Sequence, residues 1–204
     1  MIAACATQVA PTGGPEDKLP PRVAGVLPAP KTANHPNELY VKLEFDEWIN
    51  ASIPRGAITI SPPIEKKLRY EVHGKTLEVY SRAELDTGTT YTVTFAGGIK
   101  DLRGNALAKP FQVVFSTGAI IDSLTLSGRV MVSDSLVRKK AYPSVGLYLM
   151  GSERESKRYL EKYRDTTTKV LDSLPMLTKE EPLYLTAADS IGSFTFTGLK
   201  AGQS

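Results

Sequence analysis

The segment from Thr89 to Gly118 constrains the fold more than any other stretch, because it predicts two strands joined by a turn-rich loop. From Thr90 to Phe95, apolar residues alternate with threonines, a period of two that is typical of a half-buried strand. The return strand, Phe111 to Phe115, carries an aromatic residue at each end. The pair indicates an antiparallel, β-rich architecture.

Five further strands are predicted before this pair. In the clearest, Leu39 to Phe45, four apolar side chains point one way and the intervening side chains point the other. A shift of one residue would place all four in water, so the register is strongly specified. A tight turn at His73-Gly74 is predicted to join the last two strands. Short strands with Gly and Pro turns predict an antiparallel sandwich. The five predicted strands are residues 22–27, 39–45, 57–60, 68–72 and 76–80.

A turn from Leu85 to Thr90 leads into a tyrosine at the start of the next strand, Tyr91. This order resembles the tyrosine corner of immunoglobulin-like and fibronectin-like sandwiches. The resemblance implies that the Tyr91 hydroxyl bonds the backbone a few residues upstream and fixes the crossover between two sheets.

Several separated motifs carry a broader resemblance over residues 21–118. They are Leu-Glu-Phe-Asp-Glu at 43–47, Gly-Thr-Thr-Tyr-Thr-Val at 88–93, Lys-Asp-Leu-Arg-Gly-Asn-Ala-Leu at 100–107 and Phe-Ser-Thr-Gly at 115–118. With them, the segment resembles the SbsA-type bacterial Ig-like family. The resemblance implies a spacer or interaction module of exported and surface proteins, with no catalytic site and no cofactor.

A second β domain is expected from residue 119 to residue 204, with strands at 120–132, 145–150, 183–187 and 193–196. Leu-Ser-Gly-Arg-Val early and Gly-Ser-Phe-Thr-Phe-Thr-Gly-Leu-Lys-Ala-Gly late resemble carboxypeptidase-regulatory-like or transthyretin-like sandwiches. A strand normally follows the Ala-Gly turn in those domains, so we expect this domain to be cut at its carboxyl end.

The fold class predicted is therefore all-β, with two antiparallel β-sandwich domains in tandem. The second is expected to be incomplete and to carry a short helical insertion, Glu153 to Arg164, with high helix propensity and few apolar residues. Two of these apolar residues, Tyr159 and Tyr163, are candidate contacts to a partner. A solvated surface helix is the alternative reading of the insertion.

The amino terminus predicts a lipid anchor. Ile2-Ala3-Ala4-Cys5 resembles the lipobox of bacterial lipoproteins, in which the cysteine is lipidated. Residues 6–20 are rich in Pro and Gly and lack periodicity, as expected of an extended tether. The start of the chain resembles Bacteroidota-type lipoproteins that carry an Ig-like domain. The resemblance implies attachment to the outer membrane through lipid on Cys5, and a free thiol near a disordered end is the alternative.

Composition excludes several other classes. The net charge of +3 is small and dispersed, so a nucleic-acid partner is not expected. A single cysteine excludes an intrachain disulfide and a multi-cysteine metal site. Two isolated histidines do not have the spacing of a zinc site.

The loop between the two predicted strands of the segment from Thr89 to Gly118 contains candidate site residues. Asp101, Gly104 and Asn105 share one turn, which suggests either calcium binding or side-chain to backbone hydrogen bonds that hold the turn. Leu102 and Arg103 intervene where a calcium loop needs oxygen ligands, so the structural reading is favoured and no metal is predicted.

Trp48 lies just after the strand predicted at 39–45. Like Tyr159 and Tyr163, it is a candidate contact residue, here for a glycan or a protein. Its neighbours Asp46 and Glu47 point to opposite faces if extended, so they do not form a catalytic pair.

The function predicted is a non-catalytic, membrane-anchored lipoprotein that acts as a structural or interaction module, with another envelope protein or a glycan as its partner. Two alternatives stay open. The chain is the non-catalytic front of a longer glycan- or peptide-processing protein, or it is a glycan-binding module.

Overall fold

The computed structural model describes residues 14–131, 143–148 and 182–201. All regular structure in these ranges is strand, so the all-β prediction is confirmed for the part of the chain that the structure describes. The expected helix at 153–164 lies outside the described residues. None of the described segments forms a helix that is long and apolar enough to cross a membrane.

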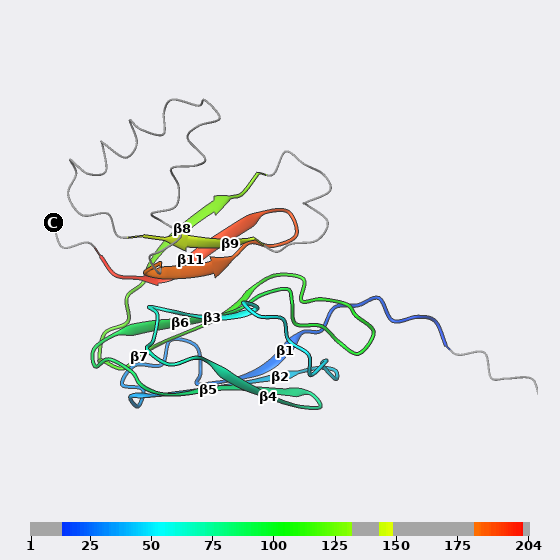
Figure 1. Cartoon of the computed structure of the whole chain (residues 1–204), viewed down its shortest axis with the longest axis horizontal. Helices are drawn as coiled ribbons and strands as arrows, with labels where there is room; N and C mark the ends of the chain where they lie inside the picture. Colours follow the sequence, from blue (N-terminus) through cyan, green and yellow to red (C-terminus); the bar gives the residue numbers. More distant parts are fainter. Residues whose placement is uncertain (1–13, 132–142, 149–181, 202–204) are drawn as a thin grey trace, which may run out of the picture.

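Seven strands form a first unit made of two antiparallel sheets packed face to face (Figure 1). One sheet has the order β1-β2-β5-β4 and the other the order β3-β6-β7. The strands are β1 (Val23–Leu27), β2 (Glu38–Phe45), β3 (Ile58–Ser61), β4 (Arg69–His73), β5 (Thr76–Glu84), β6 (Thr90–Phe95) and β7 (Phe111–Ser116).

The core of the first unit lies between these two sheets. In β2 every second residue is buried, as the alternation predicts, and the exposed fractions of Leu39, Val41, Leu43 and Phe45 are 2%, 0%, 0% and 3%. Leu77 and Val79 of β5 lie beside them in the same sheet. From the facing sheet, the fully buried core side chains are Tyr91, Val93 and Phe95 of β6 and Val113 and Phe115 of β7. Burying the four apolar side chains of β2 contributes about 6–12 kcal/mol before the entropy cost of folding.

The hairpin between β4 and β5 differs by one residue from the prediction. His73 is the last residue of β4 and pairs with Thr76, so the two-residue turn is Gly74-Lys75 rather than His73-Gly74. Gly74 has a φ of +63°, which fits the first central position of a tight hairpin turn. The glycine was identified correctly from the sequence, but the register of the turn depends on pairing with β5.

Four of the described strands form a second unit. The pair β8 (Leu124–Arg129) and β11 (Ser193–Leu199) is antiparallel, and so is the pair β9 (Ser144–Leu147) and β10 (Tyr184–Ala187). Each of the four overlaps the segment predicted for it, and β8 is shorter than its predicted segment at both ends. The ring of Phe194 packs directly on Gly128 of β8. A Cβ added at this position would overlap the ring, so the packing requires glycine.

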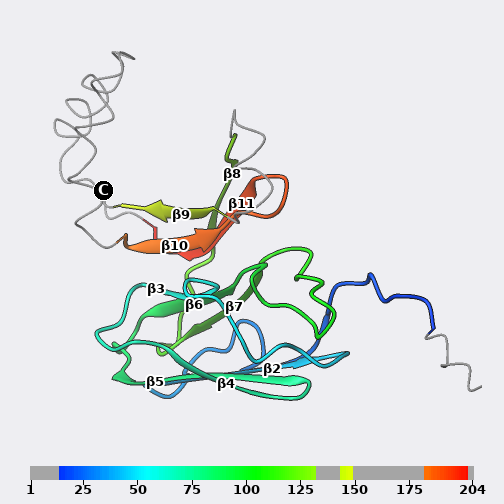
Figure 2. The ribbon, with the colours of Figure 1, turned by 45° about the vertical axis from the view of Figure 1, so that its right-hand side comes forward.

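The sheet β3-β6-β7 is the middle layer of the molecule. The sheet β1-β2-β5-β4 covers one face of it, and the second unit covers the other (Figures 1 and 2). The prediction that β6 is half-buried is therefore wrong, because all six of its residues are buried. Its threonines face the second unit instead of water, as the contacts of β11 with β6 and β7 show.

Candidate functional site

The junction between the two units is built from polar side chains on the outer face of the middle sheet. Each of its strands provides one: Ser61 from β3, Thr92 from β6 and Gln112 from β7. The Ser61 hydroxyl accepts a hydrogen bond from Leu185 N at 2.7 Å, and Thr92 Oγ1 donates to Thr197 O at 2.9 Å. We call these three side chains and their partners on β10 and β11 the threonine junction.

Gln112 is the most connected residue of the threonine junction. Its amide nitrogen donates to Thr195 O at 3.0 Å and to Thr186 Oγ1 at 3.1 Å, and its amide oxygen accepts from Thr197 Oγ1 at 2.8 Å. Ser61, Thr92 and Thr186 are buried with exposed fractions of 2%, 4% and 2%. Because buried polar groups are costly without partners, the mutual hydrogen bonds favour this one arrangement of the units.

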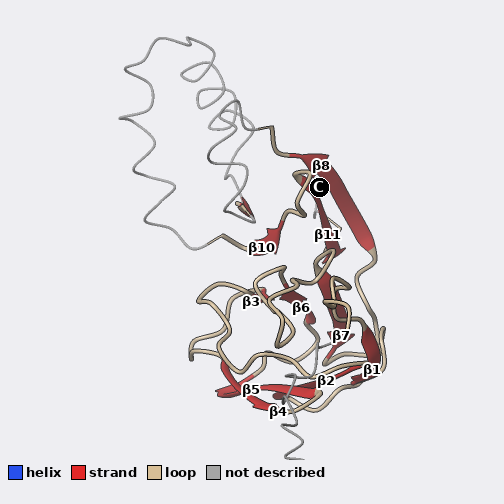
Figure 3. Cartoon of the chain, turned by 90° about the vertical axis from the view of Figure 1, so that its right-hand side faces the viewer, coloured by secondary structure: helices blue, strands red, loops and turns tan. Residues whose placement is uncertain are grey.

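The two units meet at all three strands of the middle sheet, since β10 contacts β3 and β11 contacts β6 and β7. Figure 3 shows β10 and β11 on this side of the sheet. Apolar residues of the second unit, among them Tyr184, Ala188 and Phe196, are also buried. Sequence reasoning did not identify this junction. Its one signal in the sequence is that the polar positions of β6, which alternate with the apolar ones, are all threonine. Threonine tolerates burial better than charged residues do.

Tyr91 has the geometry of a tyrosine corner. Its hydroxyl accepts a hydrogen bond from the backbone N–H of Asp86, five residues upstream, at 2.9 Å. The side chain is 1% exposed and its ring stacks near Phe115, with 6.0 Å between the ring centres. Burial is the main reason why the pKa of Tyr91 is raised above its ordinary value. The residue fixes the β5–β6 crossover between the two sheets.

Replacing Tyr91 by phenylalanine is expected to lower the free energy of unfolding by about 1 kcal/mol or more, because the Asp86 N–H loses its partner in a partly buried position. Denaturant titration followed by intrinsic fluorescence measures this change. Tyr70→Phe, which removes a half-exposed hydroxyl bonded to Ile53 O at 3.1 Å, is a control with a smaller expected effect. Equal stability of Tyr91→Phe and the parent would show that the corner does not stabilise the fold.

Asp101 braces a turn in the loop between β6 and β7. Its Oδ1 accepts hydrogen bonds from the N–H groups of Arg103 and Asn105, both at 2.8 Å, and its Oδ2 accepts from Asn105 Nδ2 at 2.7 Å. Gly104 sits between them with a φ of +95°. Burial acts to raise the pKa of Asp101, but hydrogen bonding from Asn105, Arg103 and Gly104 outweighs it and lowers this pKa.

Asp101 also faces two other carboxylates. Oxygens of Asp17, Glu47 and Asp101 lie within 4.8 Å of one another. The pKa of Glu47 is raised, first by burial and then by the negative charges of Asp101, Asp17 and Asp46. Both oxygens of Asp101 already accept hydrogen bonds from nitrogen donors, which favours the bracing role over metal coordination.

Trp48 lies on the surface, beside the β4–β5 turn. Its side chain is 60% exposed, and a Cβ on Gly74 would lie 3.7 Å from the indole ring. One face of the ring therefore packs on the turn and the other is open to solvent. This placement is compatible with contact to a partner, and the contact itself stays a prediction.

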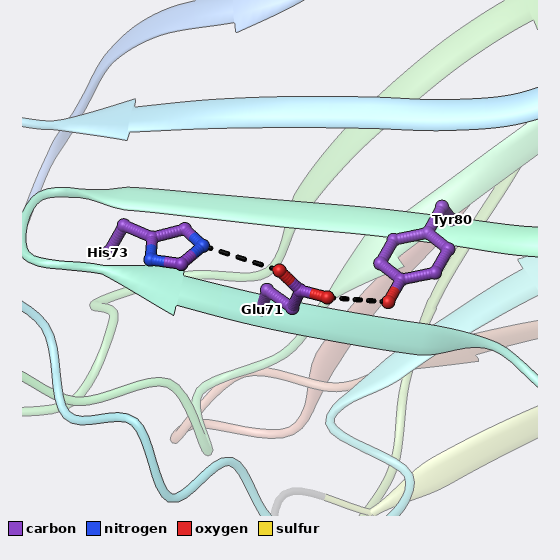
Figure 4. A network of polar contacts seen from close by, with 3 residues as sticks. All are labelled: Glu71, His73 and Tyr80. Carbon is purple, nitrogen blue, oxygen red and sulfur yellow. Dashed lines mark hydrogen bonds and ion pairs between the residues drawn. The ribbon is translucent and has the colours of Figure 1, made fainter.

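An exposed polar network joins β4 to β5 near the same turn (Figure 4). The Tyr80 hydroxyl donates to Glu71 Oε1 at 2.7 Å, and His73 Nε2 lies 3.3 Å from Glu71 Oε2. The hydrogen bonds from Tyr80 and then from His73 lower the pKa of Glu71, and the bond to Glu71 raises the pKa of Tyr80. The sequence did not indicate this network, because it needs the cross-strand register of β4 and β5.

Three predicted site residues, Cys5, Tyr159 and Tyr163, lie outside the described residues. The structure brings Asp101, Gly104 and Asn105 together in one turn, with Tyr91 and Trp48 elsewhere on the first unit.

The first unit is an antiparallel β-sandwich with an immunoglobulin-like corner. Residues 17–117 match a family model described as bacterial Ig-like domain, which supports an Ig-like domain in this part of the chain. Domains of this family are generally non-catalytic, and the fold indicates a structural or interaction module. No curated protein matches the chain.

Proposed function

We propose that this chain is a lipid-anchored protein of the bacterial outer membrane, in which the Ig-like domain and the second unit act together as a non-catalytic spacer and interaction module. The Ig-like domain supports the module role. The resemblance of residues 2–5 to a lipobox supports the anchor.

The observation that carries the spacer role is the threonine junction. It covers the outer face of the middle sheet and satisfies its buried polar groups, so it favours a single orientation of the second unit on the Ig-like domain. A spacer with a fixed internal geometry presents its outer surfaces in a defined direction. A flexible connection between the units would not do so.

The chemistry of a lipobox cysteine supports the proposed anchor at Cys5. A lipobox cysteine receives a diacylglyceryl group, and each buried methylene contributes about 0.8 kcal/mol, so two or more chains hold a protein on a membrane stably. The Pro- and Gly-rich residues 6–20 then set the distance between the bilayer and the Ig-like domain. A contact of Trp48 with a glycan and a place in front of a longer processing enzyme stay predictions.

Replacing Cys5 by alanine is expected to move the protein from the detergent-soluble membrane fraction to the soluble fraction, because the acylated sulfur is lost. The parent and the variant are produced from the native gene in the source bacterium, and fractions are compared by immunoblotting. Mass spectrometry of the amino-terminal peptide identifies the acyl groups. An unchanged distribution of Cys5→Ala between the fractions would contradict the anchor.

A further inference from the structure

A cleft opens on one side of the Ig-like domain, where both of its sheets end. The outermost strands on this side are β4 of one sheet and β3 of the other. The cleft between them has a volume of about 510 Å³. Its apolar lining includes Ile53, Ile58 and Leu68, and three cations, Arg55, Lys67 and Arg69, also line it.

The β4 edge of the cleft offers free backbone groups. Among the described strands β4 pairs only with β5, and its closing pair next to the turn is His73 with Thr76. In an antiparallel ladder that closes with a two-residue turn, the closing pair is hydrogen-bonded, and every second residue then points its N–H and C=O away from the partner. These residues are Val72 and Tyr70. The strand contains no proline, and four of its five residues are exposed, so it can accept a further strand.

All charged residues that line the cleft are cations. The ion pairs among the described residues are Lys42–Glu44 and His73–Glu71, so Arg55, Lys67 and Arg69 are unpaired within that part of the chain. An adjoining hollow of about 330 Å³ extends the basic lining with Lys66. Glu71, the carboxylate on β4, does not line the cleft and is engaged by Tyr80 and His73.

We propose that the cleft and the β4 edge bind an extended acidic peptide of a partner protein, which adds to the sheet as a strand beside β4. Backbone bonds to Tyr70 and Val72 hold the peptide, apolar side chains enter the cleft, and its carboxylates meet Arg55, Lys67 and Arg69. The inference rests on the interaction role proposed above and names its partner class. An anionic polysaccharide or lipid surface would use the cations but neither the apolar lining nor the free amide groups.

The test uses the whole chain and a fluorescein-labelled peptide of four Glu-Val repeats, with binding followed by fluorescence anisotropy. The corresponding Lys-Val peptide is expected to bind at least about tenfold more weakly, since like charges then face each other. N-methylation of alternate amides on one edge of the Glu-Val peptide is expected to cause a similar loss, because it removes the bonds to β4 and keeps the charge.

Variants of the protein test the same surface. Arg55→Gln, Lys67→Gln and Arg69→Gln combined are expected to weaken Glu-Val binding about tenfold or more. Lys42→Gln, which changes a cation paired with Glu44 on the outer sheet face, is the matched control and should leave binding unchanged. Circular dichroism checks that both variants are folded.

Two results would overturn the proposal. One is equal binding of the N-methylated and unmodified peptides. The other is absence of Glu-Val binding while vesicles containing phosphatidylglycerol bind and lose affinity in the triple variant. Membrane fractionation of Cys5→Ala does not depend on this cleft, so a failure here is distinguishable from a failure of the proposed anchor.

Discussion

Replacing Asp101 by alanine is expected to lower the free energy of unfolding by about 3 kcal/mol, because several donors lose a charged acceptor at once. The carboxylate is 1% exposed and binds the N–H groups of Arg103 and Asn105 as well as the Asn105 side chain. The turn also binds two distant segments of the same chain. Asn105 Nδ2 donates a hydrogen bond to Asp17 O at 3.1 Å, and Asp101 forms an isolated β-bridge with Ile49.

Thermal and denaturant unfolding of the purified protein measure this loss. Asp46→Ala is the matched control, because Asp46 is an exposed carboxylate that accepts one backbone bond, from Arg22 N at 2.8 Å, and it should cost about 1 kcal/mol or less. A similar small loss for Asp101→Ala would contradict the bracing role. A calcium-dependent rise in the stability of the parent that Asp101→Ala abolishes would favour metal binding instead.

The pH dependence of stability provides a second readout of the same turn. The pKa of Asp101 is lower in the folded state than its ordinary value, so its contribution is fully present above the unfolded pKa and is lost as the pH falls through the folded one. The pKa of Glu47 is higher in the folded state than its ordinary value. The stability that Glu47 contributes is therefore present below its unfolded pKa and is lost as the pH rises through the folded one. Asp101→Asn should flatten the acid limb of the stability curve and lower the pKa of Glu47 in an NMR titration.

Much of the Ig-like domain could be predicted from sequence because its strands carry their own signals. The alternation from Leu39 to Phe45 determines which side chains of β2 are buried, whatever strand lies beside them. The turn at Asp101 was equally local, since the hydrogen bonds that the Asp101 carboxylate accepts come from residues within four positions.

The remaining features depend on contacts between distant residues. The burial of Thr92 requires Thr197, which is 105 residues away, and no period in β6 distinguishes a solvated threonine face from one covered by a second unit. The approach of Asp17 to Asp101 and the cleft beside β4 also arise only once the sheets are ordered. The sequence therefore predicted the framework, and the surfaces that favour a function came from the structure.

Gly198→Ala is expected to disrupt the threonine junction and to lower the free energy of unfolding by about 3 kcal/mol. Gly198 has a φ of +71°, a conformation that costs an L residue about 1–2 kcal/mol. An added Cβ would also lie 2.9 Å from Thr92 Oγ1 and 3.2 Å from a methyl carbon of Thr90, and such overpacking costs about 1–3 kcal/mol. A shift of β11 away from β6 or a rotation of the Thr92 side chain would relieve the overlap, and either breaks the Thr92–Thr197 hydrogen bond.

Gly88→Ala separates backbone strain from the disruption of the junction. Gly88 has a φ of +68°, close to that of Gly198, but an added Cβ there meets nothing within 4 Å. Calorimetry should show one transition for the parent and for Gly88→Ala, with Gly88→Ala destabilised by about 1 kcal/mol. For Gly198→Ala we expect two transitions, and small-angle scattering should show a longer particle, because the second unit no longer stays on the middle sheet. If the two variants behave alike, the junction does not fix the units, and the rigid spacer proposed above is wrong.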